Sequence, residues 1–249
     1  MSDTDNLDLL LAEIDLLKAE LHLQCLEVPR ALQQSLDIAY THDSIALDGG
    51  TLNLAETDMV IRNGLMLPGK PMADNLTALN HYQAIQSIRE QAAEQNLLSM
   101  EALQILHGML CRGLQNQTGG AYRNQDVNLL NDHAAPQADR IPQLLAEHLH
   151  WLNLEGPFLH PLLFAAEAHL RFLSLQPFQH NNGLCARLLM NLILLAEGFP
   201  LLNIMSQQTT RSRYIAAFTD AHAGAPLKWP LFIAEQAQLD YQQLLNQLQ

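Results

Sequence analysis

The stretch Leu188 to Leu195 constrains the fold of this chain more than any other, because it is apolar on almost every side. Only Asn191 interrupts it. A helix that is apolar all round lies inside a protein or a membrane, and this run is too short to cross a bilayer. The sequence therefore predicts a helix that runs buried through the middle of a globular domain.

A loop with the composition of an anion site leads into this apolar stretch. Asn182 and Gly183 suit a turn, because both tolerate left-handed backbone angles better than most residues. The N–H groups of such a turn and of the helix that follows it attract anions. Arg187 lies about one helical turn further on and can lean back toward the same anion. The loop predicts a phosphate site, and an ordinary turn into a helix is the alternative.

With Pro177-Phe178 before it and Gly198-Phe199-Pro200 after it, the loop resembles the signature of the Fic family. That signature reads His-Pro-Phe-x-(Asp/Glu)-Gly-Asn-Gly-(Arg/Lys)-x-x-Arg. The resemblance extends over roughly residues 5 to 245. It implies an all-α, mainly helical Fic fold with a short β-hairpin flap and an N-terminal helical extension. The expected divisions are an N-terminal helical region at 1–95 and a core domain at 96–249, with the flap at 119–136 and the motif at 176–187.

The resemblance also implies an activity, and the sequence departs from it at the residues that carry the chemistry. Family enzymes transfer AMP from ATP to a protein Ser, Thr or Tyr hydroxyl, with the motif histidine as general base. That position is Gln176 here, whose amide takes up no proton near neutral pH. The acidic residue that binds Mg²⁺ in the family is His180, a poor ligand for a hard cation. The first motif arginine, a phosphate ligand, is Leu184.

The loop residues Asn181, Asn182, Gly183 and Arg187 remain as candidate nucleotide contacts, with Asn181 in place of a family glycine. ATP is the candidate cofactor that the resemblance implies. Whether Mg²⁺ accompanies it stays open, and no metal ligand is predicted.

Residues 41–50 resemble the inhibitory segment of the family, (Ser/Thr)-x-x-x-Glu-(Gly/Asn), in its N-terminal placement. Ser44, Asp48 and Gly49 occupy its defining positions. In autoinhibited relatives the glutamate pairs with the second motif arginine, which corresponds to Arg187. Asp48 is shorter than glutamate by about one C–C bond, so a direct pair and a water-bridged pair are both open.

Two functions follow from this pattern. The preferred hypothesis is a degenerate Fic protein that is impaired or inactive in AMP transfer but keeps an anion loop and a peptide-binding flap. The alternative is an active nucleotidyl- or phosphotransferase acting on protein hydroxyls, in which His180 replaces the lost base, since an imidazole titrates near neutral pH. A solvent-facing histidine is the simpler interpretation of His180.

The charge of the chain limits the classes of partner, and its cysteines indicate a compartment. The formal net charge is -13, with no basic run, so a nucleic-acid backbone would be repelled. No membrane segment is predicted. Cys25, Cys111 and Cys185 lie far apart without metal-ligand spacing and are interpreted as reduced thiols, which favours the cytoplasm.

The N-terminus carries an apolar stripe at helical spacing, Leu7, Leu10, Leu11, Ile14, Leu17 and Leu21. Packing on the domain and self-association into a homodimer are the alternatives for this stripe. A second helix is expected near residues 29–40, followed by a turn at 48–50, and further helices at 72–95, 98–113, 139–153 and 161–174. A peptide of a target protein at the flap is the other expected partner, bound by strand addition.

Overall fold

The computed structural model describes residues 2–24, 28–64, 66–94, 98–129 and 134–248. These residues form α1 (Asp3–Gln24), α2 (Arg30–Leu47), α3 (Leu54–Asn63), α4 (Met72–Glu94), α5 (Met100–Leu110), α6 (Ile141–Leu154), α7 (Pro161–Leu175), α8 (Asn182–Ala196), α9 (Gln208–His222) and α10 (Lys228–Leu248). Two 3₁₀ turns, η1 (Ala138–Arg140) and η2 (Gly156–Phe158), flank α6. The mainly helical class is confirmed, and the helices predicted from residue 72 onward correspond to α4, α5, α6 and α7.

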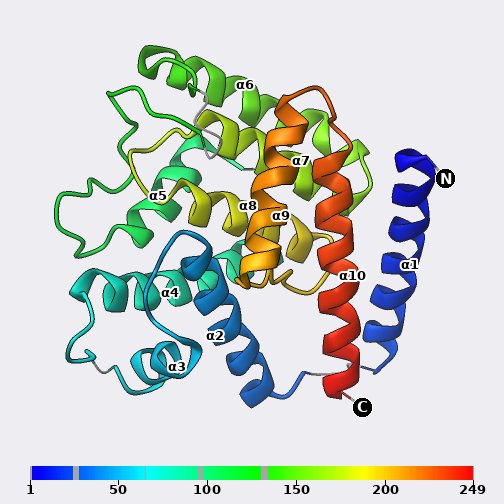
Figure 1. Cartoon of the computed structure of the whole chain (residues 1–249), viewed down its shortest axis with the longest axis horizontal. Coiled ribbons are helices and arrows are strands. Elements are labelled where there is room, and N and C mark those ends of the chain that lie inside the picture. Colours follow the sequence, from blue (N-terminus) through cyan, green and yellow to red (C-terminus); the bar gives the residue numbers. More distant parts are fainter. Residues whose placement is uncertain (1, 25–27, 65, 95–97, 130–133, 249) are drawn as a thin grey trace.

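The predicted central helix is α8, which lies in the middle of the molecule (Figure 1). It packs against α7 and α4, and it also touches α2 and α5. Leu188, Leu189, Met190 and Leu194 are completely buried. Each such side chain contributes about 1.5 to 3 kcal/mol through removal from water, so α8 holds the surrounding helices together and fixes the loop at its N-terminus.

The N-terminal stripe packs on the domain rather than on a second chain. Helix α1 runs along α10 at one edge of the molecule (Figure 1), and its buried residues are Leu7, Leu10, Leu11, Ile14 and Leu21. Lys18 Nζ donates to the Glu197 carbonyl at 2.6 Å, which ties α1 to the end of α8. The stripe is therefore not available for self-association, and a homodimer through another surface stays a prediction.

Helix α2 extends further than the sequence indicated. It ends at Leu47 rather than near residue 40, so most of the segment 41–50 is helical. The predicted turn follows directly: Gly49 has a φ of 95°, and the Gly50 N–H donates to the Ile45 carbonyl at 3.0 Å. The longer helix arises because Tyr40, Ile45 and Leu47 are all buried against the core. Helix α2 thereby carries Ser44 and Asp48 to α8.

The predicted flap is less regular than a β-hairpin in its described residues, 119–129 and 134–136. An isolated antiparallel bridge joins Asn128 to Ala134, and the described part of the flap contains no ladder. Residues 130–133 of the predicted hairpin lie outside the described residues. The segment is rich in Gly and Asn, which pair poorly in strands. Side-chain contacts, described below, hold it instead.

In the part of the chain that the structure describes, no helix has the length and apolar character needed to cross a membrane. Cys111 and Cys185 are buried free thiols, while Cys25 lies outside the described residues. The cytoplasmic location and the division of the chain at residues 95 and 96 stay predictions.

Candidate functional site

The loop between α7 and α8 is closed by left-handed residues at both ends. Gln176 ends α7 with a φ of 41°, and Asn181 precedes α8 with a φ of 58°. Between them, the Asn182 side chain clamps the loop, because its Oδ1 accepts from the Phe178 N–H at 3.0 Å and its Nδ2 donates to the Phe178 carbonyl at 2.8 Å. The hydrogen bonds of the Asn182 side chain therefore fix the conformation of the loop. The sequence predicted this residue as an anion contact.

Phe178 anchors this loop in the core. It is completely buried, and the His107 ring stacks on it with ring centroids 3.8 Å apart. The Gly120 N–H donates to His107 Nδ1 at 2.9 Å, so the neutral ring carries its proton on Nε2, which donates to the His180 carbonyl at 3.2 Å. Burial lowers the pKa of His107 to about 4 and keeps the ring neutral. Sequence reasoning missed this histidine, since it lies 73 positions away from His180.

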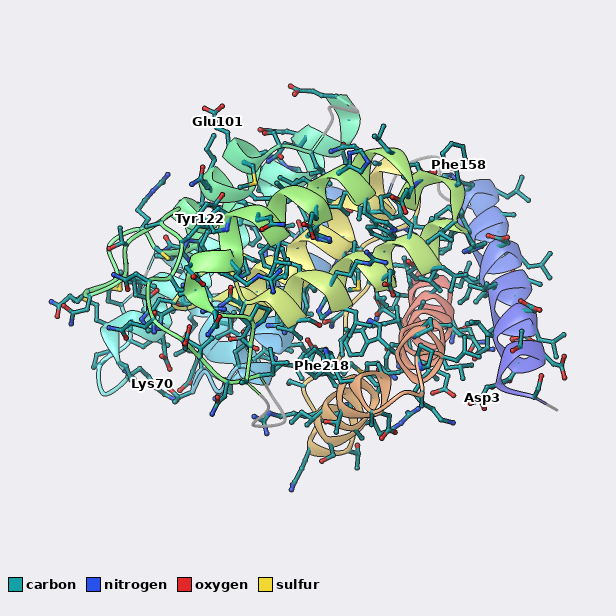
Figure 2. The ribbon with its side chains drawn as sticks, turned by 90° about the horizontal axis from the view of Figure 1, so that it is seen from above. Asp3, Lys70, Glu101, Tyr122, Phe158 and Phe218 are labelled. Carbon is teal, nitrogen blue, oxygen red and sulfur yellow. The ribbon has the colours of Figure 1, made fainter. Side chains whose placement is uncertain are left out.

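Arg123 joins the flap to the motif, and sequence reasoning gave it no role. Its buried guanidinium donates to the carbonyls of Gln176 at 2.7 Å, Gln125 at 2.9 Å and Pro136 at 2.5 Å. The Arg123 N–H also donates to the Pro177 carbonyl at 2.9 Å, beside an antiparallel bridge between Tyr122 and Phe178. Figure 2 shows Tyr122 on the side of the molecule away from Asp3 and α1. The sequence contains one signal for this role, since Arg123 is the only basic residue between Gly119 and Asn131.

Arg187 lies beneath the loop, with a side chain only 1% exposed. Its Nε donates to Ser44 Oγ and its Nη2 to the Ser44 carbonyl, both at 2.8 Å. Nη2 also forms an ion pair with Asp48 Oδ2 at 2.9 Å. Burial, the largest single influence, would by itself lower the pKa of Arg187, but the Asp48 carboxylate together with Tyr214 and Tyr40 outweighs it and holds that pKa above the ordinary value. Of the two geometries left open, the structure shows the direct pair.

The Asp48 carboxylate covers the first turn of α8. A Cβ atom added to Gly183 would lie 2.6 Å from Asp48 Oδ2 and 2.7 Å from Oδ1. The N–H groups at a helix N-terminus have no partner within the helix, and they favour a negative charge. Asp48 thus supplies an anion where the sequence predicted a bound phosphate, and Gly183 is the residue that lets it come so close.

A cavity of about 300 Å³ opens beside this carboxylate. Predicted site residues in its lining are Asp48, Gln176, His180, Asn181, Asn182 and Gly183. Arg211 and Tyr214 also line it and were not predicted. Burial raises the pKa of Tyr214 to about 12, so its hydroxyl stays neutral. The structure therefore gathers the predicted residues around one cavity, with Arg187 buried below them.

His180 lies between this cavity and another of about 320 Å³. The further cavity is lined by flap residues, among them Tyr122 and Arg123, and by His107. The His180 side chain is exposed, and Asn181 next to it donates from Nδ2 to Gln117 Oε1 at 2.7 Å. The Asn181 side chain is thus bonded to the segment between α5 and the flap, and its role as a nucleotide contact stays a prediction.

The described residues offer little to a Mg²⁺ ion. They contain no group of three or more His, Cys, Asp or Glu side chains arranged to hold a metal. Asp48 is the only carboxylate in the cavity lining, and Arg187 already pairs with it. Mg²⁺ prefers several oxygen ligands in octahedral geometry, so these residues do not fit a magnesium site by themselves.

Comparison with known proteins identifies a family domain within this chain. The sequence profile described as "Fic/DOC family" matches residues 97–194, which include α5, the flap, the loop and most of α8. The chain carries a Fic/DOC family domain. This Fic domain contains every motif residue discussed above, while Ser44 and Asp48 reach it from outside the matched range.

Named relatives and solved structures agree with this. The protein adenylyltransferase Fic of Drosophila virilis is 29% identical over 213 residues, covering 84% of this chain and 43% of that protein. The chain thus spans less than half the length of this curated relative. The structure of Fic-1 (aa134 - 508) from C. elegans superposes with a TM-score of 0.85 at 23% identity, over 96% of this chain and 71% of that one.

A more distant Fic structure, IbpAFic2 covalently tethered to Cdc42, matches with a TM-score of 0.53 at 17% identity. It covers 90% of this chain and 70% of that chain. These two structural matches support the fold, and the adenylyltransferase name belongs to the relatives.

Proposed function

We propose that this chain is a degenerate Fic protein that does not transfer AMP at a useful rate and whose anion loop is occupied by its own carboxylate. The observation that carries the proposal is the buried ion pair between Arg187 and Asp48, 2.9 Å long, with Asp48 resting on Gly183. The relatives named protein adenylyltransferase supply the reaction class against which the site is judged.

The residues around the cavity support impairment. Gln176 lines the cavity at the position of the family base, and its amide accepts no proton from an attacking hydroxyl. Loss of a positioned general base costs about 10² to 10⁴ in rate. Leu184, at the position of a phosphate-binding arginine, is buried in the core, and its side chain has neither a charge nor a hydrogen-bond donor for an anion. A nucleotide phosphate at the α8 N-terminus would also have to displace Asp48.

Peptide binding is the function that these losses leave intact. The flap base is held by the buried Arg123 side chain and by the bridge from Tyr122 to Phe178, independently of Gln176 and Leu184 side chains. A cavity lies between the flap and His180. The structure of a Fic protein covalently tethered to Cdc42 supports a protein partner for this chain. We infer that the flap side receives an extended segment of a target protein.

Calorimetric titration of ATP, with and without Mg²⁺, tests the occupied loop. We expect at most weak binding to the unmodified protein and binding at least about tenfold tighter to Asp48→Ala, because that variant uncovers the α8 N-terminus and leaves Arg187 unpaired. Adding Arg187→Ala to Asp48→Ala should remove the gain. The matched control is Asp58→Ala, whose carboxylate pairs with Arg62 on the surface. ATP binding as tight before as after the Asp48 substitution would refute the occupied loop.

The alternative function is supported by one specific observation, the exposed His180 side chain at the edge of both cavities. In that position it is open to an incoming hydroxyl. This alternative predicts nucleotidyl or phosphoryl transfer to protein that His180→Ala abolishes. The control is His42→Ala, which removes a histidine of α2 outside the loop. If this variant abolished transfer equally, His180 would not be the catalytic base.

A further inference from the structure

A cavity remote from the Fic motif lies between α2, α4, α10 and residues 200–205. Its volume is about 270 Å³, close to the lower end of the range for small-molecule pockets. The proposed function makes no use of it. Its wall combines carboxylates and amides with an apolar part, and this combination defines the chemistry of a guest.

Three of the polar residues in the lining, Asp43, Asn203 and Asp240, form what we call the acceptor corner. Asn203 connects the two carboxylates: its backbone N–H donates to Asp240 Oδ2 and its Nδ2 donates to Asp43 Oδ2, each at 2.8 Å. Both bonds reach the Oδ2 atoms, and Asp240 Oδ1 accepts no hydrogen bond among the described residues. The corner consequently keeps an unused carboxylate acceptor, which a donor of a guest can fill.

The corner also lacks a positive charge. Arg89 lines the same cavity but pairs with the buried Asp37 at 2.7 Å. Asp43 is stabilised by Ser206, which donates from its N–H at 3.1 Å and from its hydroxyl at 2.6 Å. Asp240 has no ion-pair partner in the described parts of the chain. Burial, strengthened by the nearby Asp43 charge, raises its pKa to about 7, as expected for an acid without a compensating cation.

The apolar part of the wall suits a short hydrocarbon stem. It includes Leu36, Ala39, Pro200, Leu201 and Leu244. A protonated primary amine carries three donors and a positive charge at one end, and its stem gains from burial against such side chains. We propose that this cavity binds a small primary ammonium compound with a short apolar stem, its ammonium group at the acceptor corner of Asp43, Asn203 and Asp240.

The charged and titratable groups that face the corner set the pH dependence. They are Tyr40 and Asp43 of α2, Arg89 of α4 and Asp240 of α10, with His42 bonded to Asp43. Burial keeps Tyr40 neutral by raising its pKa. Asp240 is the group that titrates near neutrality, and only its ionised form attracts an ammonium. Affinity should therefore rise as the pH increases from 6 to 8.

The test is a titration of the full chain at pH 8 with butylammonium chloride, and separately with 1-butanol as a neutral probe of similar size. We expect saturable butylammonium binding, at least about tenfold tighter than that of butanol. Asp240→Asn should weaken butylammonium binding at least about tenfold, and Glu235→Gln, which removes an acid of α10 outside the cavity lining, should leave it unchanged. Thermal unfolding of both variants checks that they fold.

The proposal is overturned if butanol binds as well as butylammonium, because the cavity is then merely apolar. It is also overturned if Asp240→Asn binds like the unmodified protein, or if no saturable binding occurs. Should Asp240→Asn fail to fold, the unmodified protein decides the matter, since its butylammonium affinity must fall when the pH is lowered from 8 to 6.

Discussion

Arg187 shows how a buried charge is kept in this protein. At its charged end the guanidinium bonds to Ser44 of α2 through two acceptors and pairs with the carboxylate of Asp48, the residue that follows α2. Removing a guanidinium from water is costly unless it is paired and hydrogen-bonded. Asp48 itself is 37% exposed, so the pair lies at the border between core and cavity. Its strength is intermediate between that of a surface pair and that of a fully buried one.

Replacement of Asp48 by alanine should therefore destabilise the protein by about 1 to 3 kcal/mol, below the range for a fully buried pair because of solvent screening. Urea unfolding measures this loss. The control is Asp58→Ala on α3, whose pair with Arg62 is exposed and should contribute less than about 1 kcal/mol. If both variants lost the same free energy of unfolding, the Arg187 pair would stabilise the fold no more than an exposed pair does.

At the scale of elements, the loop, the flap and α5 form one unit held by side chains rather than by a sheet. Arg123 reaches carbonyls on both the flap and the motif, and His107 of α5 stacks on Phe178. The planar guanidinium presents its donors in a fixed fork. A hairpin ladder is thus unnecessary for holding the described part of the flap against the loop.

The variant Arg123→Lys should loosen the flap. A lysine ammonium cannot reach the separate carbonyls that the guanidinium fork serves, so buried acceptors lose partners at about 1 to 3 kcal/mol in total. We expect lower stability and faster proteolysis within residues 119–136. Arg112→Lys is the matched control, because Arg112 is exposed and makes one side-chain bond, to Gln83 at 3.3 Å. Unchanged proteolysis in Arg123→Lys would show that the backbone bridge alone fixes the flap.

The elements that could be predicted from sequence are those with local signals. Apolar periodicity located α1 and α8, and the glycines located the turn after Asp48, because these features depend on neighbouring residues. The roles of His107 and Arg123 depend on contacts with residues 73 and 53 positions away, which no local pattern encodes. The Asn182 side chain bonds to its own loop backbone, which the sequence pattern did not indicate, and its role as an anion contact stays a prediction. Buried corners such as Asp43 with Asp240 likewise exist only after folding.

At the scale of the whole molecule, buried neutral histidines dominate the response to acid. Burial lowers the pKa of His81 to about 3 and those of His107 and His148 to about 4, and it lowers that of His169 as well. An unfolded chain protonates its histidines near pH 6.5. The unfolded state therefore binds more protons than the folded state in the window below that pH, and stability falls as the pH drops from about 6.5 to 4.

Asp240 acts in the opposite direction, because the folded protein keeps its proton up to a pKa of about 7. It is one group against four histidines, so we expect the urea midpoint to decrease steadily from pH 7 to pH 4. Unfolding curves at fixed ionic strength measure this. The variant His148→Leu should reduce the slope of the urea midpoint against pH, because it removes one of these buried titratable rings. Neither ring nitrogen of His148 has a hydrogen-bond partner in the described structure that the substitution would break. A midpoint that rises on acidification would contradict the neutral state of these histidines.

Direct detection of AMP transfer to protein tests whether this chain has lost the reaction. Purified protein would be incubated with Mg²⁺ and ATP labelled in the α-phosphate, alone and with cell lysate, beside its Arg187→Ala variant. We expect no labelled protein above the level of the variant, because Gln176 supplies no base and Asp48 occupies the anion loop. Labelling that disappears with Arg187→Ala would refute the loss of AMP transfer and establish an active transferase.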